Sequence, residues 1–134
     1  MLKLSEMKER DLIMAEYDSQ WHEGEVLQVD RSDEKVLVQT SPDQEFWYEM
    51  KHIKAIPLDE AQLFILGFQK QANADGSVKY MKGAFRVLLH HPEDFNSFEM
   101  WYREDQRHIG QPIHVHDFQN KYAAMTKVTL AKGE

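Results

Sequence analysis

Three short apolar runs, separated by polar turns, occupy residues 26–48, which read VLQVDRSDEKVLVQTSPDQEFWY. The polar residues 30–34 suit a hairpin loop, and Ser-Pro-Asp at 41–43 is typical of a turn. Phe-Trp-Tyr at 46–48 combines three residues that favour strands. This stretch therefore predicts three consecutive antiparallel strands.

Apolar runs on either side extend the pattern. Residues 12–15, LIMA, precede a turn cluster at 18–20, and residues 53–57 close the segment at a proline. Five short strands in so short a segment favour a small closed barrel, because closure leaves no strand edge exposed. We therefore predict a first domain over residues 1–57.

Helix signals begin immediately after Pro57. Asp59 is a plausible N-cap with Gln62 as its capping-box partner, and Gly67 is a natural helix end. A short helix is therefore expected from Asp59 to Leu66, with Leu63 and Leu66 on its buried face.

Residues 58–134 read as an α+β segment with an antiparallel sheet. We expect a turn at 73–76, strands at 85–89, 98–102 and 110–115, and a loop at 90–96. Phe118, Tyr122 and Met125 recur at helical spacing, which predicts a final helix over 117–125. The expected fold class is α+β and β-rich: a five-stranded barrel followed by an antiparallel sheet with two short helices.

Composition excludes several classes of site. The 134 residues include no cysteine, so disulfides and cysteine-ligated zinc are excluded. The apolar runs are too short to cross a bilayer, and the N-terminal sequence lacks the apolar region of a signal peptide. We expect a cytoplasmic protein without membrane contact, and no motif indicates a cofactor.

The negative charge is concentrated in the first segment. Residues 1–57 carry 13 acidic and 7 basic side chains, a balance of −6, whereas residues 58–134 carry 10 and 9. The first segment should therefore repel duplex DNA and attract a basic protein or peptide. The nearly neutral second segment leaves nucleic-acid contact open.

Residues 15–26, AEYDSQWHEGEV, carry a resemblance to Tudor domains. In those domains an apolar strand leads through an acidic turn into an aromatic pair and a second strand. Trp21-His22 stands where Trp-Tyr is usual, and residues 41–43 replace the later Asp-Tyr-Gly turn. The resemblance implies an SH3-like barrel for residues 1–57.

The whole chain also resembles a group of small uncharacterised bacterial proteins, often seen in prophage-like contexts. One motif runs from IPLDE at 56–60 to LGF at 66–68, and the other is VHDFQNKY at 115–122. In the group the second motif usually reads Val-His-x-Leu-Gln-Asn-x-Tyr, so Phe118 departs from it, as does Lys127, where a glycine is usual. This resemblance implies a shared fold and no particular reaction.

Two histidines, His114 and His116, are candidate metal ligands. Residues i and i+2 of a strand face the same side, so both imidazoles could meet one metal ion. A third ligand would have to come from His90, His91 or Asp117. A helix that began at Asp117 would instead separate the pair.

A structural role for His116 is the alternative. Gln119 and Asn120 follow it by three and four residues and share its helical face. We expect these three side chains to form a hydrogen-bonded polar cluster that fixes how the final helix docks on the sheet.

The first segment carries more large aromatic side chains than a small barrel can bury. Alternation places Phe46 and Tyr48 on one face of their strand and Trp47 on the other. Tyr17, Trp21 and Trp47 are the expected exposed aromatics, where a partner would dock, and together with Phe46 and Tyr48 such side chains could form a cage for a cation. Equally, residues 58–134 could cover these aromatics in one continuous core.

No nucleophile constellation or glycine-rich phosphate loop is present, so the sequence leans away from an enzyme. The leading hypothesis is a non-catalytic protein-interaction module. The alternatives are a metal-assisted hydrolase using His114 and His116, and a nucleic-acid accessory protein of phage origin.

Overall fold

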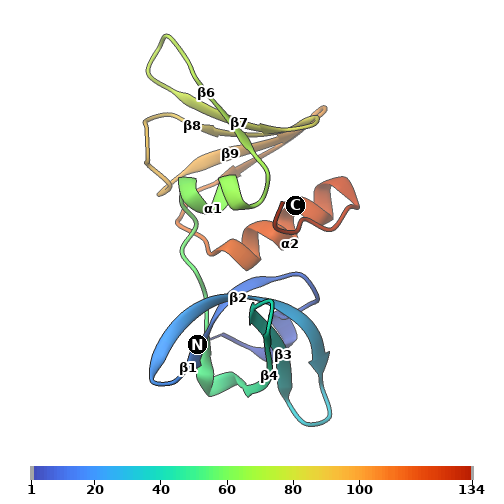
Figure 1. Cartoon of the computed structure of the whole chain (residues 1–134). Coiled ribbons are helices and arrows are strands. Elements are labelled where there is room, and N and C mark those ends of the chain that lie inside the picture. Colours follow the sequence, from blue (N-terminus) through green and yellow to red (C-terminus); the bar gives the residue numbers. More distant parts are fainter. Residues whose placement is uncertain (1, 134) are drawn as a thin grey trace.

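Two five-stranded antiparallel sheets, with two α-helices between them, make up the computed structural model, which describes residues 2–133 (Figure 1). The first sheet has the strand order β4-β3-β2-β1-β5. Its strands are β1 (Leu12–Tyr17), β2 (Gln20–Asp30), β3 (Lys35–Ser41), β4 (Gln44–Glu49) and β5 (Ile53–Lys54). Single turns of 3-10 helix, η1 (Leu4–Glu6) and η2 (Met50–His52), precede β1 and β5.

The turns of the first sheet follow from their sequence. Asp18 and Ser19 both adopt positive φ angles, 53° and 62°, as a two-residue hairpin turn requires. In the next loop, the Asp30 carboxylate accepts hydrogen bonds from the backbone N–H groups of Ser32 and Asp33, each at 3.0 Å. The strands so joined bury a small core on one face, which includes Ile13, Ala15, Val26, Val36, Val38 and Ile53.

The five predicted strands are present, but the predicted closure of the barrel is wrong. β4 and β5 are the two edges of the sheet, and within residues 2–133 no strand ladder joins them. Only Ile53 and Lys54 continue along β1, because Ile56 and Leu58 turn away to join the core of the second unit. Burying these two side chains there takes the chain away from the path that closure would need.

The second sheet has the order β10-β9-β8-β7-β6. Its strands are β6 (Gln69–Ala72), β7 (Val78–Lys82), β8 (Phe85–Leu89), β9 (Phe98–Tyr102) and β10 (Asp105–Ile109). The antiparallel sheet and the strands predicted over 85–89 and 98–102 are confirmed. The hairpin of β6 and β7 was not predicted, because β6 is polar and exposed along its whole length.

Both predicted helices are confirmed: α1 (Glu60–Ile65) and α2 (Val115–Thr126). The Asp59 carboxylate accepts the Gln62 N–H at 2.9 Å, and Gly67 ends α1 with a φ of 93°. The strand predicted over 110–115 is wrong. The last strand ends at Ile109, and α2 already begins at Val115. The Asp117 carboxylate caps this helix start by accepting the His114 N–H at 3.3 Å.

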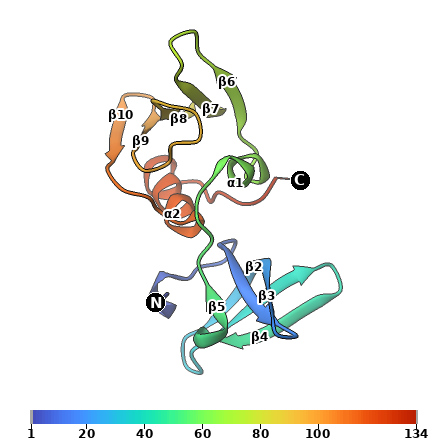
Figure 2. The same cartoon turned by 90° about the vertical axis from the view of Figure 1, so that its left-hand side faces the viewer.

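The two units share a packed junction. The segment after β5 crosses from the first sheet to α1 (Figure 2), and Leu12 of β1 belongs to the core of the second unit rather than the first. Both helices lie between the sheets (Figure 1), so α2 contacts β1 directly. Among the described residues, no helix has the length and apolar character needed to span a bilayer.

Candidate interaction surface

The three aromatics predicted to be exposed are all accessible, but they do not form one patch. Tyr17 is 37% exposed, Trp21 38% and Trp47 47%. Tyr17 follows Ile13 and Ala15 on the core-facing side of β1, whereas Trp21 pairs with Glu16 and therefore faces the other way. Trp47 likewise points away from the core.

Tyr17 instead meets Phe46, which is 43% exposed. The two rings stack with their centroids 5.4 Å apart and their planes at 11°. The ring centroids of His22 and Tyr17 lie 6.1 Å apart, and Tyr48 meets Phe46 edge-on with ring centroids 6.5 Å apart. These four side chains, named here the mouth cluster, continue the small core of the first sheet out to solvent.

Tyr48 anchors the mouth cluster. Its side chain is buried, and its hydroxyl has no hydrogen-bond partner among the described residues. Burial raises the pKa of the Tyr48 phenol above its ordinary value, and the nearby Tyr17 phenol raises that pKa further. The mouth cluster therefore has the buried, uncharged Tyr48 phenol at its inner end and exposed aromatic rings at its outer end.

Acidic side chains flank the aromatic residues of β4. Alternation places Glu45, Trp47 and Glu49 on the outer face of this strand, opposite to Phe46 and Tyr48. Glu45 is exposed, and Glu49 has Lys51 within 3.7 Å. Strand β4 therefore presents aromatic side chains on both faces and two carboxylates beside Trp47.

Trp21 lies in a different place, at the junction of the two units. The Lys54 ammonium sits 4.4 Å from the centre of its ring, so one face of Trp21 already has a cationic neighbour. A groove of about 630 Å³ beside it is also lined by His114, His116 and Asp117. Tyr17, Trp21 and Trp47 therefore lie in three separate parts of the protein surface.

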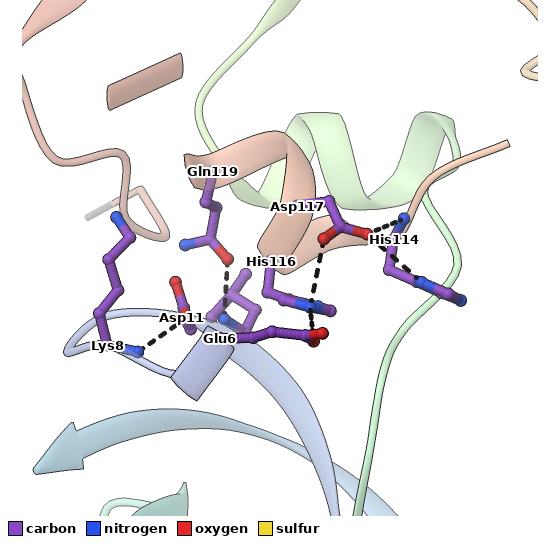
Figure 3. A network of polar contacts seen from close by, with 8 residues as sticks. Glu6, Lys8, Asp11, His114, His116, Asp117 and Gln119 are labelled. Atoms are coloured by element: carbon purple, nitrogen blue, oxygen red, sulfur yellow. Dashed lines mark hydrogen bonds and ion pairs between the residues drawn. The ribbon is translucent and has the colours of Figure 1, made fainter. Parts of the chain in front are cut away.

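The histidine pair begins α2 rather than lying on a strand. The rings of His114 and His116 are stacked with centroids 6.0 Å apart. His116 is buried, and its Nε2 lies 3.3 Å from Glu6 Oε2 and 3.4 Å from Asp117 Oδ1 (Figure 3). Within residues 2–133 no group of three or more His, Asp or Glu side chains has the arrangement of a metal site.

The proposed third ligands are engaged differently. His90 lies in the loop after β8 and pairs with Glu99 at 3.1 Å, and His91 is exposed in the same loop. Asp117 does contact His114 and His116, but its carboxylate caps the N-terminus of α2 by accepting the His114 N–H. The geometry therefore favours the structural reading of the histidine pair.

Gln119 is the central polar residue of the junction. Its side chain is fully buried; Oε1 accepts the Leu12 N–H at 2.8 Å, and Nε2 donates to the carbonyls of Arg10 at 2.8 Å and Leu130 at 2.9 Å. The expected trio is not formed: no hydrogen bond joins His116, Gln119 and Asn120 in the described part of the chain, and Asn120 Oδ1 is buried without a partner. Each side chain acts separately, and Gln119 ties α2 to the start of β1 and to the segment that follows α2.

Asp11 is a buried acid that sequence reasoning missed. Its Oδ2 accepts the Lys8 N–H at 3.0 Å, while Oδ1 is buried without a partner among residues 2–133 (Figure 3). Burial is the largest cause that raises the pKa of Asp11, to about 7, and the nearby negative charge of Asp117 also raises it. An aspartate in the charged stretch 8–11 offered no sequence signal of burial, because α2, which lies over it, comes more than a hundred residues later.

Comparison of the chain with protein-family models, with curated proteins and with solved structures found no match. The likeness of residues 15–26 to Tudor domains and of the two longer motifs to small bacterial proteins therefore stays a prediction.

Proposed function

We propose that this protein is a non-catalytic interaction module that docks a basic protein segment on the first sheet. The observation that carries the proposal is the exposed aromatic surface of β4, where Phe46 stacks on Tyr17 and Trp47 stands between two carboxylates. We also propose an SH3-like relationship for this unit, opened at its β4 and β5 edges, which the strand order and the 3-10 turn before β5 support.

Exposure of these aromatics supports docking because they lie outside the junction between the units. Among the aromatic residues of the first sheet, Tyr48 is buried in the small core, while Tyr17, Phe46 and Trp47 are each more than a third exposed. Tryptophan and tyrosine, together with arginine, are enriched among the residues that dominate binding energy at protein interfaces. Their exposure costs solvation free energy, which a partner would recover.

Charge supports a basic partner. The balance of −6 over residues 1–57 gives this unit a negative field, and Glu45 and Glu49 place part of it directly beside Trp47. Lysine and arginine side chains can contact both a carboxylate and an aromatic face. A partner segment rich in these residues therefore satisfies both features of the surface.

The test is a titration of the full-length protein with a synthetic peptide in which lysine alternates with valine, followed by calorimetry. We expect saturable binding that weakens as salt rises from about 50 to about 500 mM, because salt screens exposed charges. Phe46→Ala and Trp47→Ala should each weaken binding by about tenfold or more.

Phe64 provides a matched control, because it is 46% exposed but lies on α1, in the second unit. Phe64→Ala should leave binding unchanged. Equal binding by all three variants, or no binding of the peptide at low salt, contradicts the proposal.

A further inference from the structure

The outer edge of β4 carries the further inference. A strand at the edge of a sheet has unpaired backbone N–H and C=O groups that can pair with another strand. β4 pairs with β3 on one side and is the edge of its sheet, so no strand of residues 2–133 pairs with its other side. Its six residues span about 20 Å along this edge.

The other sheet edges differ from β4 in length or in side chains. β5 has two residues. β6 presents Gln69, Lys70 and Gln71, and β10 presents a run of polar side chains from Asp105 to His108. Among the edges in residues 2–133, β4 is the one where exposed backbone coincides with exposed large aromatics.

We propose that a basic, extended segment of a partner protein adds to this edge as a further strand, with alternate Lys or Arg side chains over Glu45, Trp47 and Glu49. This rests on the proposed function and specifies how the partner binds. Side chains of an added strand alternate between the faces of the sheet, so every second residue falls on the outer face of β4. The Glu-x-Trp-x-Glu spacing of residues 45–49 matches that period.

The opposite face of the added strand would meet the mouth cluster. Phe46 stands there against Tyr17, with Tyr48 beneath it. Apolar residues that alternate with the basic ones would pack on this aromatic surface. The two faces of β4 therefore select opposite kinds of side chain, which defines a pattern of alternating basic and apolar residues.

Charge argues against a second copy of this chain as the occupant. Two β4 strands paired antiparallel about Trp47 would place Glu45 of one chain opposite Glu49 of the other. Like charges directly opposite each other destabilise a strand pair. The same carboxylates that oppose self-association attract a basic strand.

Backbone methylation of the peptide separates strand addition from other modes of binding. The probes are the lysine–valine peptide, the same peptide N-methylated on its lysine amides, and the same peptide N-methylated on its valine amides. Backbone N–H groups of successive residues point to opposite sides of a strand. One methylated peptide should therefore lose about tenfold or more in affinity for the full-length protein, and the other should bind nearly as well as the parent.

The outcomes distinguish the two proposals. If all three peptides bind equally and binding still depends on Phe46 and Trp47, strand addition is overturned and the interaction module stands. If the parent peptide does not bind, the proposed function fails as well. A concentration-dependent dimer that Trp47→Ala abolishes would assign the β4 edge to a second copy and overturn the inference.

Discussion

Replacement of the buried Asp11 carboxyl by an amide should stabilise the protein at neutral and alkaline pH. In the folded state the pKa of Asp11 is about 7, against an ordinary value of 3.8. The folded protein therefore holds a proton on Asp11 over a range of pH in which the unfolded chain has released it. As pH rises from about 4 to about 7, the free energy of unfolding contributed by this group falls.

The size of this effect follows from the shift in pKa. Each unit corresponds to about 1.4 kcal/mol, so a shift of this size lowers stability by about 4 kcal/mol between pH 4 and pH 8. Asp11→Asn cannot ionise, and its side-chain carbonyl can still accept the Lys8 N–H that Oδ2 receives now. The variant should match the wild type near pH 4 and exceed it at pH 8, where its melting temperature should be higher by roughly 10 °C.

Thermal unfolding of both proteins at several pH values between 4 and 8 measures the difference. Comparison with the wild type isolates Asp11, because the other titrating groups are common to both. Asp33→Asn, a change at an exposed loop residue, is the control and should shift the melting temperature little at any pH. A melting temperature for Asp11→Asn below that of the wild type at pH 8 would refute the reasoning.

Three further substitutions test the junction and one helix end. Gln119→Leu removes three hydrogen bonds between α2 and its neighbours, two of them buried and one partly buried, so chemical denaturation should show a loss of about 3 kcal/mol or more. A loss below about 1 kcal/mol would mean that Gln119 does not join the units. His116→Ala removes a buried ring that contacts Glu6, and scanning calorimetry should show a melting temperature several degrees lower; no change would count against a structural role. Gly67→Ala places a Cβ 2.6 Å from the Lys82 ammonium at a φ of 93°, so the free energy of unfolding should fall by about 1 kcal/mol. Gly76→Ala also has a positive φ but open space around its Cβ, so it controls for the backbone conformation alone.

Local sequence was sufficient to predict most of the strands and both helices. The hairpins of the first sheet depend on turn residues such as Asp18-Ser19, and α1 depends on the Asp59 cap, all of which lie within a few positions of the elements they define. Helical spacing of Phe118, Tyr122 and Met125 similarly predicted the buried face of α2. Errors arose where local signals were weak, as in the polar strand β6 and in residues 110–115, where β-like residues precede a helix start.

The sequence also predicted that large aromatics of the first segment would exceed its core, because residue counts and strand alternation limit how many can be buried. It could not predict which of them meet. The stack of Tyr17 on Phe46 joins the end of β1 to β4, which are separated in the sheet by β2 and β3, and the curl of the sheet brings them together.

The tertiary structure alone decided the open edge of β4 and the burial of Asp11 and Gln119. Closure of the barrel depended on where Ile56 and Leu58 would be buried, and they joined a core whose other members come mainly from residues 58–134. Asp11 is desolvated by a chain fold that brings α2 over the start of β1. The open barrel and the burial of Asp11 and Gln119 all depend on contacts between residues far apart in the sequence. The free energies of such contacts are not set by the spacing of neighbours along the chain.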